Sequence, residues 1–162
     1  MSHKALSGEI EWGKALDLIK HEGFYMFGGK NEKGQAMNTL YIIKLTEDKF
    51  GHFHFSIIQP KMIGKPPPPR HSNTITFMPK LGQMIIVGGR NDQCNRNPVL
   101  NDIWLITLYN MEYHQVKIGG DHIPIPRSNH SAIVNETQVI ICGGLGFHLD
   151  YLKDVQVLEF DQ

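Results

Sequence analysis

"MIIVGGRNDQCNRNPVLNDIWLITL", residues 84 to 108, is the stretch that decides the fold. Its first apolar run ends on two glycines, Gly88 and Gly89, and a polar loop separates that run from a second one around Trp104. Short runs of β-branched and aromatic residues bounded by Gly, Pro, Asn and Asp are typical of strands. Asn101 and Asp102 suit the turn into the second strand, because their side chains bond nearby backbone groups. The stretch therefore predicts two short strands joined by a loop.

The glycine pair occurs three times. "FYMFGG" ends at Gly29, "MIIVGG" at Gly89 and "VIICGG" at Gly144, so the first glycines stand at positions 28, 88 and 143. Each pair precedes a polar loop and a matching apolar run: "MNTLYIIKL" from Met37, "LNDIWLITL" from Leu100 and "LKDVQVLEF" from Leu152. Glycine allows backbone conformations or close approaches that a Cβ atom forbids. Four strand-like segments fit in each period, and residues 14 to 20 are expected to be one of them.

A second sequence feature, a proline-containing segment that ends in arginine, repeats with nearly the same spacing as the glycine pairs. "FSIIQPKMIGKPPPPRHS" covers residues 55 to 72, and "YHQVKIGGDHIPIPRSNHS" covers residues 113 to 131. Each contains an aromatic residue, a glycine, a proline-containing run and then an arginine, Arg70 or Arg127. The two arginines are separated by nearly the glycine period, which indicates an internal repeat.

Together these marks resemble the kelch repeat from about Trp12 to Asp161. The residues that carry the resemblance are Gly28, Gly29, Gly88, Gly89, Gly143, Gly144, Asn101, Asp102, Trp104 and Asp154. The resemblance implies an all-β fold of about three four-stranded antiparallel blades, a partial kelch-type β-propeller. The expected blades are residues 8–60, 66–118 and 123–162, the last without its outer strand.

The repeats also depart from the family pattern. "EWGKALD" stands where the first repeat should have a proline–arginine run, and Thr39 replaces the Asp102 and Asp154 of the other repeats. Closed propellers have about 4–8 blades, so three blades leave two apolar faces open. Three solutions follow: the remaining blades belong to a longer chain, two chains form a homodimer, or another protein caps the array.

The composition excludes some partners. Sixteen Lys and Arg residues balance sixteen Asp and Glu residues, so neither nucleic acid nor a membrane is an expected partner. Two cysteines in no CxxC pair, together with a start that lacks the apolar core of a signal peptide, predict a cytoplasmic protein.

Several motifs hint at chemistry. "GEIEWGKA", residues 8 to 15, has the phosphate-loop spacing but places Ala15 where Ser or Thr should hold magnesium. His52 and His54 would share one face of a strand, but the sequence places no third zinc ligand beside them. The Ser and His residues after Arg70 and Arg127 lack a nucleophile elbow. We therefore expect no catalytic residue, no metal and no cofactor, and not an enzyme.

The expected function is protein–protein interaction, as a scaffold or adaptor that binds a protein or peptide through loops at one propeller face. These loops cover residues 30–37, 90–100 and 145–152. The expected partner-binding residues are Arg70, Arg90, Asn91, Arg96, Arg127, Phe147, His148 and Tyr151. For the arginines, and for Arg70 and Arg127 above all, the alternative is that they are solvated or bond the blade backbone. The alternative functions are an enzyme domain of the propeller-oxidase or lyase type and a purely structural part of a larger assembly.

Overall fold

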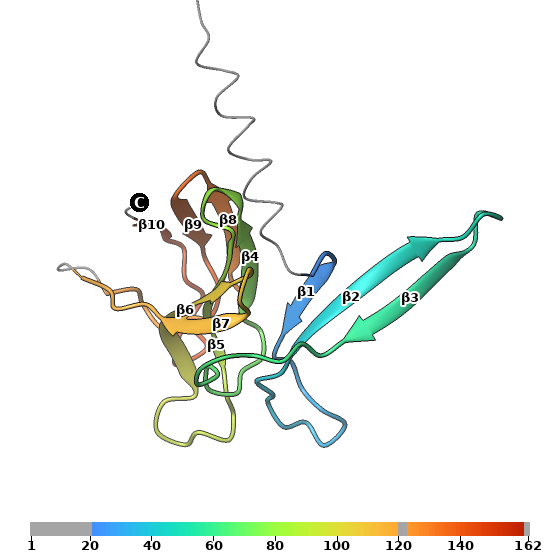
Figure 1. The fold of residues 1–162 in the computed structure, drawn as a ribbon. Coiled ribbons are helices and arrows are strands. Elements are labelled where there is room, and N and C mark those ends of the chain that lie inside the picture. Colours follow the sequence, from blue (N-terminus) through green and yellow to red (C-terminus); the bar gives the residue numbers. More distant parts are fainter. Residues whose placement is uncertain (1–20, 120–122, 161–162) are drawn as a thin grey trace, which may run out of the picture.

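A computed structural model of the chain describes residues 21–119 and 123–160, and in them ten strands form three antiparallel sheets (Figure 1). The first sheet contains β1 (Phe24–Phe27), β2 (Leu40–Glu47) and β3 (Phe53–Ile58), in that order. The second has the order β4 (Thr74–Met78), β5 (Gln83–Arg90), β6 (Val99–Thr107) and β7 (Glu112–Gln115). The third has the order β10 (Val155–Glu159), β9 (Gln138–Cys142) and β8 (Ser131–Asn135). The predicted all-β class is confirmed.

The second sheet has the four strands expected of one repeat, and its only helical feature is a short 3-10 turn, η1 (Pro79–Leu81). The first and third sheets have three strands each within the described residues. The predicted strand at residues 14–20 lies outside the described residues. The three glycine pairs lie at the C-terminal ends of β1, β5 and β9, where the apolar runs of the sequence end.

The core consists of two apolar clusters, one on either side of the second sheet. Between the first and second sheets, Phe27, Leu40 and Ile42 pack with Met84 and Ile86. The second cluster joins the second sheet to the third, and its buried members are Met78, Ile85, Val87, Ile103, Val139 and Ile141. Because side chains alternate along a strand, β5 supplies residues to both clusters in turn. A strand buried on both faces explains the unbroken apolar run before Gly88.

The glycine pairs lie where one sheet meets the segment leading into the next. Gly28 has φ +78° and Gly88 has φ +53°, in the left-handed region that glycine occupies without strain. A Cβ atom on Gly28 would collide with the carbonyl oxygen of Arg70, and a Cβ atom on Gly88 would lie 2.6 Å from that of Arg127. Both backbone conformation and close approach therefore require glycine.

Two backbone hydrogen bonds complete each junction. At the first junction, Gly29 N donates to Arg70 O (2.9 Å) and Arg70 N donates to Met37 O (2.8 Å). At the second, Gly89 N donates to Arg127 O (2.8 Å), and Arg127 N donates to Leu100 O (3.1 Å). The two junctions have the same construction, so the sequence repeat is also a repeat of contacts between sheets.

Candidate functional site

Arg70 is fully buried, and its guanidinium is surrounded by hydrogen-bond acceptors of its own sheet. Its Nη1 and Nη2 donate to the two carboxylate oxygens of Asp102 at 2.8 and 2.7 Å, and Nη1 also donates to Gly88 O at 2.9 Å. Asp102 accepts a further hydrogen bond from Trp104 Nε1 at 2.7 Å. This pairing of the two planar groups satisfies the buried guanidinium.

Arg127 repeats the arrangement one sheet later. Its guanidinium donates to Asp154 at 3.1 and 2.6 Å and to Gly143 O at 2.8 Å, and its side chain is only 1% exposed. The hydrogen bond from Arg127 lowers the pKa of Asp154, because it favours the ionised carboxylate. Both arginines match the structural alternative, since they bond the blade rather than face a partner. We therefore leave Arg70 and Arg127 out of the binding surface proposed below.

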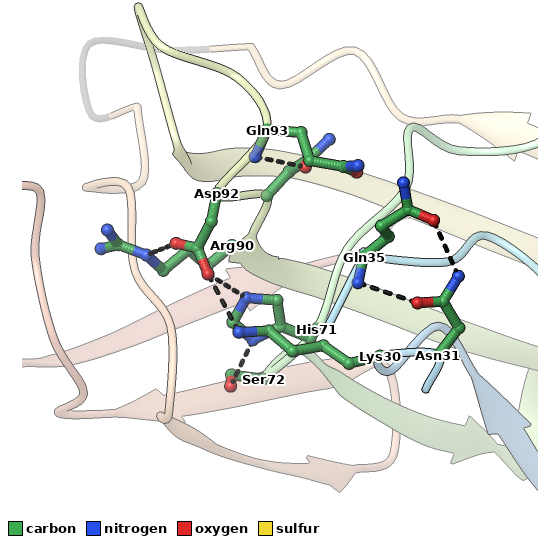
Figure 2. A network of polar contacts seen from close by, with 9 residues as sticks. Lys30, Asn31, Gln35, His71, Ser72, Arg90, Asp92 and Gln93 are labelled. Atoms are coloured by element: carbon green, nitrogen blue, oxygen red, sulfur yellow. Dashed lines mark hydrogen bonds and ion pairs between the residues drawn. The ribbon is translucent and has the colours of Figure 1, made fainter. Parts of the chain in front are cut away.

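A polar cluster at the surface is centred on Asp92, in the loop between β5 and β6 (Figure 2). Its Oδ1 accepts a hydrogen bond from Arg90 Nε, and its Oδ2 contacts Lys30 Nζ and His71 Nε2, each at 3.0 Å. The Arg90 hydrogen bond, followed by that of Lys30, lowers the pKa of Asp92 well below its usual range. Asp92 thus ties the β5–β6 loop to the β1–β2 loop and to the segment leading into β4.

The two loops joined by this cluster are each braced from within. Asn31 Oδ1 accepts hydrogen bonds from the backbone N–H groups of Lys33 and Gln35, at 3.0 and 2.9 Å. Asn91 Oδ1 accepts one from Gln93 N at 3.1 Å, and Asn91 N donates to Pro98 O at 2.7 Å. Such asparagine turns hold a loop in one shape. Both loops extend to the same side of the molecule, at the bottom of Figure 1.

The remaining predicted contact residues occupy two positions. Arg96 is exposed in the β5–β6 loop. Phe147, His148 and Tyr151 are exposed in the loop between β9 and β10, where the Phe147 and His148 rings meet edge to face at 5.0 Å. The structure therefore places Asn91 and Arg96 on one loop, with Arg90 at the strand end beside it, and the three aromatic side chains on another loop.

The sequence interpretation overlooked Lys30, His71 and Asp92 as members of the site. One signal in the sequence could have identified Lys30 and Asp92, but not His71. The glycine pairs of the first two repeats are followed by a basic residue and, two positions later, by an acidic one: Lys30 and Glu32, then Arg90 and Asp92. The contact of Lys30 with Asp92 joins two different repeats, which only the stacking of sheets reveals.

Ser72, His71 and Asp92 also have the composition of a nucleophilic triad. His71 Nδ1 lies 3.0 Å from Ser72 Oγ, and Ser72 has φ +54°. However, Asn129 occupies the matching position of the next repeat with the same φ, so the backbone conformation belongs to the repeat. The Asp92 carboxylate is already engaged by two cations, which weakens its ability to stabilise a protonated imidazole.

The other candidate sites lie elsewhere. His52 and His54 both contact Asp48 Oδ2, at 3.3 and 3.2 Å, at the exposed turn between β2 and β3. Across residues 21–119 and 123–160, no group of three or more His, Cys, Asp or Glu side chains is suited to hold a metal ion. Cys94 and Cys142 are free and exposed. Among the described residues, no helix has the length and apolar character needed to cross a membrane.

Comparison with known proteins fits these observations. The KLHDC2/KLHL20/DRC7 Kelch-repeats domain matches residues 13–162. An F-box/kelch-repeat protein of Arabidopsis thaliana is 28% identical over 153 residues, which are 90% of this chain and 30% of that protein. Host cell factor 1 of Rattus norvegicus is 30% identical over 144 residues, which are 82% of this chain and 7% of that protein.

A third relative, putative adagio-like protein 2 of Oryza sativa subsp. japonica, is 26% identical over 135 residues, which are 83% of this chain and 20% of that protein. The chain thus spans less than a third of the length of each of these relatives. The three stacked sheets, the repeated glycine–arginine junctions and the match over residues 13–162 agree, and the chain belongs to the kelch-repeat family.

Proposed function

We propose that the chain is a protein-interaction module that binds a carboxylate-bearing peptide or protein surface through the β1–β2 and β5–β6 loops. The observation that carries the proposal is the Asp92 cluster, which fixes two loops of different sheets against each other and holds Arg90 beside them. A braced pair of loops loses little conformational entropy when a partner binds, which favours affinity. Membership of the kelch-repeat family is consistent with a binding role.

The charge of these loops supports an acidic partner. The β1–β2 loop has two basic residues and one acidic residue, Lys30, Lys33 and Glu32. The β5–β6 loop has Asp92 and Arg96, and Arg90 stands directly before it at the end of β5. The formal net charge of the whole chain is zero, so positive charge is locally enriched here. Arginine presents forked donors that pair with carboxylates.

The β9–β10 loop supplies contacts of a different kind. Its one Lys or Arg residue is Lys153, at the β10 end, and it exposes Phe147 and Tyr151. Aromatic side chains of this sort often anchor a partner by filling apolar pockets. We propose that they contact the same partner and that the chain acts as a non-enzymatic cytoplasmic scaffold or adaptor.

Capture of acidic peptides tests the proposal. A library of Glu- and Asp-rich peptides is immobilised beside neutral peptides in which Gln and Asn replace the acidic residues. The wild-type chain is expected to bind the acidic set, and the R90A/R96A variant is expected to lose at least about tenfold in affinity, because two charge-assisted contacts are removed.

A matched control removes two exposed cations elsewhere. Lys49 lies at the β2–β3 turn and Lys117 follows β7, so K49A/K117A leaves both loops intact. Capture should survive in this control. Equal capture by R90A/R96A and the wild type, or equal binding of acidic and neutral peptides, contradicts the proposal.

A further inference from the structure

We draw no further inference here: the strongest candidate, the exposed apolar face of the third sheet around Val155 and Val157, carries none, because nothing within residues 21–119 and 123–160 shows what covers it.

Discussion

Arg127 shows how a single residue can hold a sheet together. Its guanidinium joins Asp154 on one side and Gly143 O on the other, so it links the start of the third sheet to its β9–β10 loop. Arg70 does the same in the second sheet through Asp102 and Gly88 O. Removing such an arginine leaves a carboxylate and a carbonyl without their donor, which costs more than the pair itself contributes.

Arg127→Ala is expected to lower the free energy of unfolding by about 3 kcal/mol, because a buried ion pair loses one partner. Urea unfolding at pH 7 and one protein concentration measures the change. Arg96→Ala is the control, and its exposed side chain should change stability by no more than about 0.5 kcal/mol. Equal free energies of unfolding for the two variants would show that the contacts of Arg127 with Asp154 and Gly143 O do not stabilise the fold.

His130 gives the chain a pH response. Burial, followed by the charge of Arg127, lowers its pKa from 6.5 to about 4. Between these two values the unfolded chain binds the proton more strongly, so stability should rise as pH increases from 4 to 6.5, by on the order of 3 kcal/mol. The lowered pKa of Asp154 acts in a lower range, where stability falls as pH drops below 3.8.

Asn73 stands three residues after Arg70, as His130 stands three residues after Arg127. His130→Asn therefore introduces the residue that the preceding repeat has at this position. Unfolding followed between pH 4 and 6.5 should be flatter in this variant than in the wild type. An unchanged slope would assign the pH response to other groups.

At the scale of elements, the strands were largely predictable from the sequence, whereas the partners of the buried arginines and the polar site were not. Apolar runs and glycine pairs predicted β5, β6 and their loop because these signals are local. The role of Arg70 depends on Asp102, which is 32 residues away, and on burial between stacked sheets. The contact of Lys30 with Asp92 spans 62 residues, so no local pattern could reveal it.

The Asp92 cluster is expected to affect binding more than stability. Exposed ion pairs contribute at most about 1 kcal/mol each, so Asp92→Ala should lower the free energy of unfolding only slightly. Capture of acidic peptides should nevertheless weaken, because Arg90 and Lys30 lose the group that holds them. Glu32→Ala changes the equivalent acidic residue of the first repeat and serves as the control. If Asp92→Ala strongly lowers the free energy of unfolding but leaves the capture of acidic peptides unchanged, the cluster has a purely structural role.

The glycine pairs connect neighbouring sheets. Gly88→Ala forces a left-handed conformation on alanine, which costs about 1–2 kcal/mol, and it brings Cβ to within 2.6 Å of Arg127 O. We expect a loss of stability larger than the conformational cost alone, measured by urea unfolding. Gly119→Ala is the control, since no atom of the described residues lies within 4 Å of its added Cβ. Similar midpoints for both variants would contradict the close approach at the junction.

The whole molecule is a stack of kelch sheets in which each contact between neighbours uses the same parts. Two junctions are complete, at Arg70 and at Arg127, and the third sheet presents the same groups without a described partner. The β1–β2 and β5–β6 loops lie beside the completed junctions, so their relative positions depend on the stacking. The repeated junction is therefore the feature on which the stacking of the sheets and the relative positions of these loops both depend.

Amide hydrogen exchange at Gly29 and Gly89, followed by NMR, tests this junction most directly. Both N–H groups donate to an arginine carbonyl of the following sheet's leading segment. They are expected to exchange as slowly as the Ile85 amide in the centre of β5, with exposed Gly119 as the fast reference. Exchange of Gly29 and Gly89 at the rate of Gly119, while Ile85 stays protected, would show that the sheets do not dock in this way.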